Sequence, residues 1–204
     1  VPPTIMHRPV FQATASANLD LVARVVDNNA TPATSPALTS SIFYCAGSGC
    51  TPTTEAASAE DLGNGYFRFR IPSATISTAG TIVRYFLRAT DGTNTQNFKQ
   101  PDNSPFQLTS AAAGAVTITG SVKDSTGTCV AGIQGARVLA EGSGFNATTD
   151  GSCNYTMSGM TAGTFDLIAV KSGYADRTIN GIPAGATGIA FQLPAGGGGG
   201  FGGD

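Results

Sequence analysis

The sequence contains no tryptophan and a single histidine, His7, and only 12% of its 204 residues are charged. One histidine is too few for a two-histidine metal site or a repeated proton shuttle. A Ser/His/Asp triad would depend on His7, which stands beside Arg8 and Pro9, and we interpret His7 as a strand residue near the surface. The net charge of −2 does not give the footprint of a nucleic-acid-binding protein. No nucleic-acid partner is therefore expected.

Long apolar runs are also missing. The uncharged stretch from Ser104 to Val122 contains Pro105, Gly114, Gly120 and many hydroxyl side chains, so no membrane span is expected there. No secretory signal is visible at Val1, which fits either a cytosolic protein or the mature form of a secreted one.

The patterns of common metal and carboxylate sites are absent as well. There is no C-x-x-C pair for zinc and no D-x-D-x-D-G run for calcium. Glu60 and Asp61 are adjacent and point to opposite sides of an extended chain, which defeats a glycosidase-like carboxylate pair. The aspartates at predicted strand ends are assigned to turns, where they accept hydrogen bonds from backbone two residues on: Asp27, Asp91, Asp124 and Asp150. We predict no enzyme activity, no metal and no cofactor.

What the chain does contain is Gly, Ala, Ser and Thr in abundance, with few Lys and Glu, a composition that favours short strands and tight turns. Apolar runs with Pro and Gly between them predict strands at 4–10, 19–27, 37–44, 66–72, 81–92 and 105–109. Seven or so short strands at this spacing predict an all-β protein built on antiparallel β-sandwiches.

Alternation within these runs assigns a core face and a solvent face. The predicted core contains Leu19, Leu21, Ala23, Val25, Phe67, Phe69, Ile71, Val83, Tyr85, Leu87 and Ala89. The arginines between them point outward: Arg68, Arg70, Arg84 and Arg88. A basic patch for an anionic ligand is one interpretation of these arginines, and a solvated sheet face is the favoured one.

The words I-M-H-R-P-V, L-V-A-R-V-V-D, G-N-G-Y-F-R-F-R-I-P and V-R-Y-F-L-R-A-T-D-G resemble fibronectin type III and related immunoglobulin-like modules over residues 1–110. The chain departs from that family in lacking a core tryptophan. Residues Thr109 to Ala115 are small and show no periodicity, which predicts a linker in this stretch. In the predicted domain division the linker is residues 111–115.

A second resemblance covers residues of about 115 to 194. The stretch T-T-D-G-S-C-N-Y-T-M-S-G-M-T-A-G-T-F-D-L-I-A-V-K-S-G-Y-A, together with T-G-S-V-K-D and G-A-R-V-L-A, closely resembles the carboxypeptidase regulatory-like domain. This resemblance implies a transthyretin-like β-sandwich at 116–194 that is non-catalytic and is appended to secreted enzymes, surface proteins and transporters.

The four cysteines, an even number in a Thr-rich, low-charge chain, favour two disulfides and an oxidising compartment. If the strands of the second domain run up and down in order, the turns with Cys129 and Cys153 meet at one end of the sandwich. We therefore pair Cys129 with Cys153 and Cys45 with Cys50. The alternative pairings would join two separate domains.

The last residues, 195–204, form a Gly-rich tail. One interpretation is a disordered tail or a linker, and the other is a segment that orders against a neighbouring subunit with Phe201 as its anchor.

Taken together, these features predict an extracellular or cell-surface protein that works by binding. We expect a structural or adhesive subunit of a fibre, appendage or matrix, with other protein subunits or surface components as partners. The alternative is a pair of accessory domains from a larger secreted hydrolase.

Overall fold

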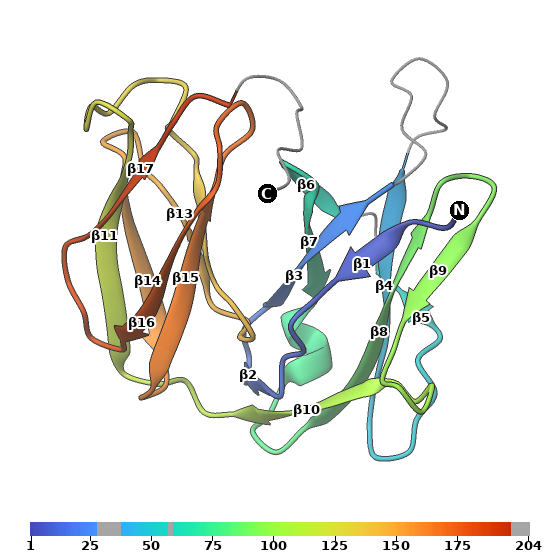
Figure 1. The fold of residues 1–204 in the computed structure, drawn as a ribbon. Helices are drawn as coiled ribbons and strands as arrows, with labels where there is room; N and C mark the ends of the chain where they lie inside the picture. The colour runs from blue at the N-terminus through green and yellow to red at the C-terminus, as the bar shows by residue number, and fades with distance from the viewer. Residues whose placement is uncertain (28–37, 57–58, 197–204) are drawn as a thin grey trace. The chain divides into compact units, whose positions relative to one another are not determined.

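The computed structural model describes residues 1–27, 38–56 and 59–196, and almost every regular element in them is a strand (Figure 1). Phe201, the expected assembly anchor, lies outside these residues. By contacts the chain divides into two compact units, whose main border along the sequence is between Ala113 and Gly114. Each unit is a β-sandwich, which confirms the predicted fold class.

In the described residues, unit 1 has ten strands and one short 3-10 helix. The elements are β1 (Thr4–Met6), β2 (Gln12–Thr14), β3 (Leu19–Val26), β4 (Thr39–Ala46), β5 (Thr54–Glu55), β6 (Glu60–Gly63), β7 (Tyr66–Ile71), η1 (Ser73–Ile76), β8 (Ile82–Thr90), β9 (Thr95–Phe98) and β10 (Phe106–Ala111).

These strands form two sheets in the order β1-β3-β7-β6 and β2-β10-β8-β4-β5, with β9 added to the end of β8 (Figure 1). Strand β2 runs parallel to β10, and the following pairs are antiparallel: β1-β3, β3-β7, β10-β8, β8-β4, β4-β5 and β8-β9. A fibronectin type III or immunoglobulin-like module in unit 1 stays a prediction.

Alternation predicts the core of unit 1 correctly. The four apolar residues of β3 on its core face, Leu19 to Val25, are each at most 3% exposed, and the expected core residues of β7 and β8 are buried with them. Phe106 and Leu108 of β10 close the same core. Large aliphatic and aromatic side chains on the facing sheets thus bury the apolar surface that stabilises the sandwich.

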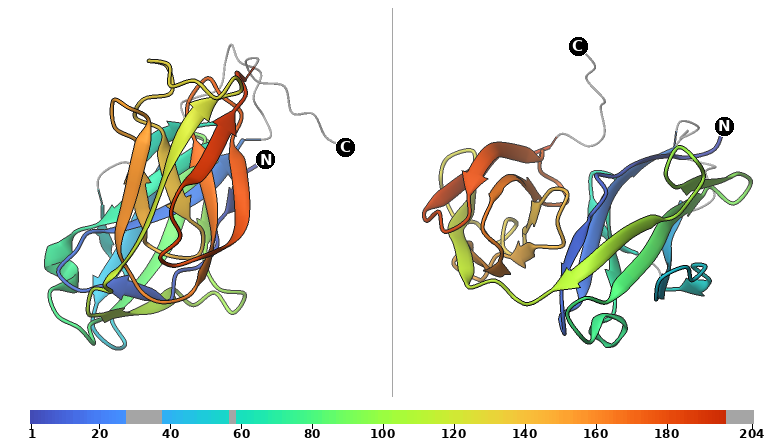
Figure 2. Two further views of the ribbon diagram at one scale, coloured as in Figure 1. Left: turned by 90° about the vertical axis from the view of Figure 1, so that its left-hand side faces the viewer. Right: turned by 90° about the horizontal axis from the view of Figure 1, so that it is seen from below.

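Unit 2 contains seven strands, β11 (Val116–Asp124), β12 (Arg137–Ala140), β13 (Asn146–Thr148), β14 (Asn154–Met160), β15 (Thr164–Val170), β16 (Arg177–Pro183) and β17 (Ile189–Leu193). The two sheets have the orders β14-β11-β17 and β13-β12-β15-β16, and Figure 2 gives two further views of them. The consecutive strands β14 and β15 belong to different sheets, so the largely exposed turn at Thr161–Gly163 carries the chain from one sheet to the other.

Two features of the fold differ from the sequence prediction. Strand β10 extends to Ala111, so Thr109–Ala111 pair with β2 and do not belong to the linker. Sequence periodicity gave no sign of β2, β5, β6 and β9, which have two to four residues each. Alternation over so few positions carries no signal, and their pairing with long neighbours makes them strands.

Gly120 allows three chains of unit 2 to approach closely. It lies on the central strand β11 and pairs with Tyr155 on one side and with Ile189 on the other. A Cβ at this position would stand 1.9 Å from the Ile189 carbonyl oxygen. The Tyr155 hydroxyl, which donates to that same oxygen at 3.3 Å, occupies the space that a side chain would need.

Gly120→Ala is therefore expected to destabilise unit 2 by about 1–3 kcal/mol, the usual cost of overpacking a tight core. Gly151→Ala is the matched control, because nothing lies within 4 Å of a Cβ placed there. Urea unfolding followed by circular dichroism compares the two variants. Equal stability of the two proteins would contradict the close approach at Gly120.

Candidate interaction surfaces

Both expected disulfides are present in the structure. Cys45 and Cys50 are joined with their Cα atoms 6.2 Å apart and close the loop after β4. Cys45 pairs through its backbone with Arg84 of β8, and the Arg84 guanidinium donates to the Cys50 carbonyl oxygen at 2.8 Å. The disulfide and the arginine together hold this loop against the outer face of the sheet.

The second disulfide, between Cys129 and Cys153, closes one end of unit 2 with Cα atoms 5.7 Å apart. The turns beside it carry two of the expected aspartates. Asp124 accepts hydrogen bonds from the backbone N–H groups of Thr126 and Thr128. Asp150 accepts them from the backbone N–H groups of Ser152 and Asn154. Asp91 of unit 1 accepts from the backbone of Thr93. For these three aspartates the turn prediction is confirmed.

His7 lies directly after β1, just outside the strand in which it was expected, and its ring is partly buried. The ring lies among aromatic side chains, with centroids 5.9 Å from Tyr85, 6.1 Å from Phe98 and 6.2 Å from Phe106. These rings fill the space between the two sheets at the start of the chain. His7 is thereby part of the packing of unit 1.

The ring nitrogens of His7 complete a hydrogen-bonded chain. The buried backbone N–H of Val10 donates to the Tyr85 hydroxyl at 3.0 Å, and that hydroxyl lies 3.0 Å from His7 Nε2. His7 Nδ1 lies 2.8 Å from the Val22 carbonyl oxygen. A neutral ring with its proton on Nδ1 satisfies every group in this chain, with Tyr85 donating to Nε2.

Burial disfavours the charged forms of the His7 and Tyr85 side chains. It lowers the pKa of His7 from 6.5 to about 4, although the hydrogen bond to Val22 acts in the opposite direction. Burial also raises the pKa of Tyr85 well above its ordinary value, opposed by the hydrogen bond from Val10. The pair is therefore neutral at pH 7, which suits an anchor of the N-terminal segment.

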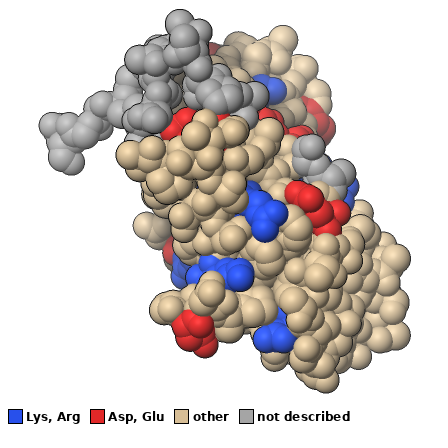
Figure 3. Space-filling model, turned by 90° about the vertical axis from the view of Figure 1, so that its right-hand side faces the viewer, with Lys and Arg blue, Asp and Glu red and all other residues tan. Residues whose placement is uncertain are grey.

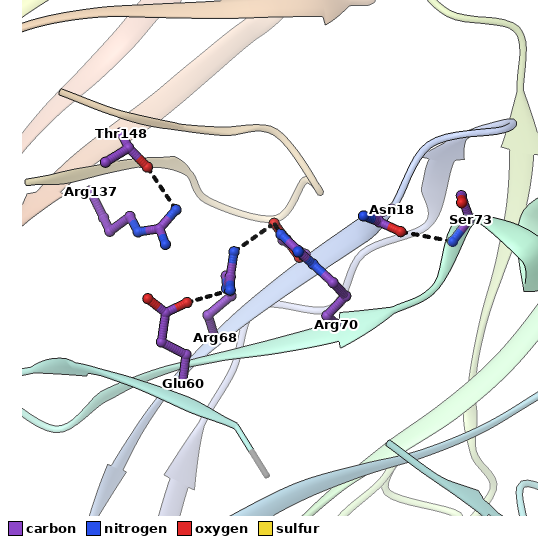
Figure 4. Close-up of polar contacts among 8 residues, drawn as sticks. Asn18, Glu60, Arg68, Arg70, Ser73, Arg137 and Thr148 are labelled. Carbon is purple, nitrogen blue, oxygen red and sulfur yellow. Dashed lines mark hydrogen bonds and ion pairs between the residues drawn. The ribbon is translucent and has the colours of Figure 1, made fainter. Parts of the chain in front are cut away.

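The outward arginines of β7 form ion pairs, which the interpretation as a solvated sheet face did not include. Arg70 binds Asp20 of β3 with two parallel hydrogen bonds, of 2.7 and 2.8 Å. Arg68 reaches the same carboxylate at 3.4 Å and also pairs with Glu60, as Figure 4 shows. Asp20 is only 6% exposed. A buried carboxylate is stable here because guanidinium groups neutralise it.

In unit 2, the close-up shows a separate contact between Arg137 of β12 and the hydroxyl of Thr148 on β13 (Figure 4). These two residues are also paired through their backbones. The contact ties a three-residue strand to its neighbour.

The outer face of the β8–β4 sheet carries an aromatic pair with a cation at each end. Phe43 and Phe86 stack with centroids 4.9 Å apart and planes 4° from parallel. The Arg88 guanidinium lies 4.2 Å from the centroid of Phe43, and the Lys99 ammonium lies 4.8 Å from that of Phe86. Such contacts stabilise a cation over a ring and fix its position.

A shallow hollow of about 230 Å³ opens beside Phe86 on this face. Its lining contains two cationic side chains and no acidic one: Cys50, Thr51, Pro52, Arg84, Phe86, Lys99 and Pro105. Figure 3, which views the right-hand side of Figure 1, shows separate patches of Lys and Arg among mostly uncharged residues. The sequence pattern placed Arg84 on this face, and it gave no sign of Lys99 or of the stacked rings.

The two units differ in their sheet edges. The edge strands of unit 1, β1, β2, β5 and β6, have two to four residues. In unit 2, the edge strand β16 has seven residues, five of them exposed, and pairs only with β15 in the described part of the chain. A bulge interrupts this pairing near Gly181, whose N–H donates to the Asp166 side chain at 2.9 Å. The residues before the bulge present an open backbone edge.

Within the described ranges, no three His, Cys, Asp or Glu side chains are grouped so that they would hold a metal ion. None of the helical segments described is long and apolar enough to cross a membrane.

The fold and these surfaces define a protein of two β-sandwiches, each with one internal disulfide. Residues 117–194, which make up most of unit 2, match the family model of the carboxypeptidase regulatory-like domain. This match confirms the resemblance expected for the second half of the chain. No curated protein sequence is significantly similar to the chain.

Among solved structures, an interface mutant of the type II cohesin–X-dockerin complex from Acetivibrio cellulolyticus is 21% identical, with a TM-score of 0.36. That match covers 40% of this chain and 59% of the other. The Bacillus anthracis TIE protein is 11% identical with a TM-score of 0.30, over 95% of this chain and 40% of the other. The chain thus spans less than two thirds of the length of either structure.

Proposed function

We propose that this chain is a non-catalytic extracellular protein with a structural or adhesive role, a subunit of a surface fibre, appendage or matrix. Its partners are other protein subunits, most simply further copies of itself. The proposal includes Phe201 as an apolar anchor of the Gly-rich segment, docking against a neighbouring subunit.

The observation that carries the proposal is the open edge of β16. An unpaired strand edge offers a row of backbone donors and acceptors to a strand of another molecule, which is a common mode of protein assembly. Arg177 and Thr178 of this edge are exposed and lie before the bulge. Unit 1, whose edge strands are short, offers less backbone for such pairing.

The disulfides support the extracellular part of the proposal. Both cross-links close loops within one unit and leave no free cysteine among the described residues. Disulfides form and persist in oxidising compartments and are rare in the cytosol.

Electron microscopy of the purified, oxidised chain tests the assembly role. We expect fibres or ordered arrays for the native sequence, and their loss in Thr178→Lys, because a charge on the edge opposes strand addition. Ser125→Lys adds the same charge in an exposed turn and is expected to leave the assemblies intact. Dispersed monomers of the native chain under all conditions would contradict the proposal.

The match of residues 117–194 to a carboxypeptidase regulatory-like domain favours one alternative. In that role the two units are accessory domains of a larger secreted hydrolase and position its substrate. The alternative predicts that the chain stays monomeric and that fusion to its parent enzyme changes substrate binding. Full-length gene context and the microscopy separate the two roles.

A further inference from the structure

The hollow beside Phe86 combines positive charge with a preformed apolar wall. Arg84 and Lys99 both line it, and neither has an ion-pair partner in the part of the chain that the structure describes. Arg84 uses one terminal nitrogen to bind the Cys50 carbonyl oxygen, while its Nε is buried and has no hydrogen-bond partner among the described residues. No acid among these residues therefore neutralises the positive charge of Arg84 or Lys99.

The position of both cations is fixed before any ligand arrives. The Cys45–Cys50 disulfide holds the loop that receives Arg84, and Phe86, itself only 8% exposed, lies under the Lys99 ammonium. Pro52 and Pro105 form rigid apolar walls. A site with fixed charges loses little conformational freedom when it binds.

The charge and size of the hollow define what fits. Two cations with no acid among the lining residues select an anion, and a volume of about 230 Å³ suits one short side chain rather than an extended chain. Stacking of a sugar ring is disfavoured, because Phe43 and Lys99 already cover the ring of Phe86. A carboxylate at the end of a short aliphatic stem meets the proline walls and the cations together.

We propose that this hollow binds an Asp or Glu side chain of an acidic peptide segment on a protein partner. The carboxylate accepts hydrogen bonds from Arg84 and Lys99, and its stem packs on Pro52 and Pro105. This inference extends the proposed assembly role, since it names the chemistry that a partner subunit or surface protein presents to unit 1.

Nuclear magnetic resonance titration of the isotope-labelled full chain tests the site. The probes are a capped tetraglutamate peptide, the matching tetraglutamine peptide and polygalacturonate, a polysaccharide that carries the same charged group. We expect tetraglutamate to shift the backbone signals of Thr51, Phe86 and Lys99 in a saturable and salt-sensitive way. Neither tetraglutamine nor polygalacturonate is expected to shift them.

Variants make the test specific. Lys99→Gln is expected to weaken tetraglutamate binding roughly tenfold, the scale of one hydrogen bond to a charged group. Lys123→Gln, which removes the same charge from β11 of unit 2, is expected to leave the affinity within about twofold, because Lys123 does not line the hollow. Joint replacement of Cys45 and Cys50 by Ala is expected to weaken binding as well, because the loop wall is then no longer held.

Three results would overturn the inference: shifts spread over all basic residues, equal effects of the two lysine variants, or binding of polygalacturonate in place of the peptide. Failure of the proposed peptide site can be distinguished from failure of the assembly role. Fibres without peptide binding refute the site alone, and peptide binding by a monomer under all conditions refutes the assembly role alone.

Discussion

Joint replacement of Cys129 and Cys153 by Ala is expected to lower the free energy of unfolding of unit 2 by about 3 kcal/mol. The two cysteines are 24 positions apart, and their cross-link restricts the unfolded chain over that loop. Cys153 is also fully buried, so Ala keeps an apolar side chain at that place in the core. Urea unfolding, with hydrogen exchange mass spectrometry to assign each transition to its unit, measures the loss.

The other disulfide supplies the control for this prediction. Cys45 and Cys50 are only 5 positions apart, so their cross-link restricts a shorter loop. Its removal is expected to destabilise unit 1 by about 2 kcal/mol in the same chain-entropy model. If the short-loop variant lost as much stability as the long-loop variant, loop closure would not be the source of the effect.

Acidification from pH 7 to pH 4 is expected to lower the stability of unit 1 by about 3 kcal/mol through His7 alone. The folded pKa of His7 is lowered to about 4, whereas the unfolded chain titrates near 6.5. Between pH 6.5 and about pH 4, His7 is therefore mostly protonated in the unfolded state and mostly neutral in the folded state. The contribution of the neutral ring is complete above that pH and is lost progressively as the pH falls to about 4.

His7→Gln tests this prediction, because the variant retains no group with an ordinary pKa near 6.5 apart from the chain terminus. The aspartates in the turns titrate at lower pH than His7, so they affect stability outside this range. Hydrogen bonds from Asn94 and Thr93 lower the pKa of Asp91 to about 2, and those from Thr126 and Thr128 lower the pKa of Asp124. Urea unfolding at a series of pH values should show a flatter profile for the variant between pH 6.5 and 4. Parallel profiles for both proteins would contradict the role of His7.

The core and long strands could be predicted from the sequence because alternation persists over six to nine residues in β3, β7 and β8. The same alternation placed Arg68 and Arg84 on the outer face. It could not show where their guanidinium groups end, because Asp20 lies 48 positions from Arg68 and the Cys50 carbonyl 34 positions from Arg84. Such partners depend on which strands lie side by side.

The hollow beside Phe86 was beyond sequence reasoning for a related reason. Its cations come from β8 and from the segment after β9, and its walls come from the disulfide loop and from Pro105. No local sequence motif marks any of these residues as part of a binding site. Only the pairing of β8 with β4, β9 and β10 brings the four segments together.

The assembly role is the central claim, and sedimentation velocity of the oxidised chain over a wide concentration range tests it most directly. We predict that the mean mass rises with concentration beyond that of one chain and that Thr178→Lys abolishes the rise while Ser125→Lys preserves it. A chain that sediments as a monomer at every concentration, or a rise unchanged by Thr178→Lys, would contradict assembly through the edge of β16.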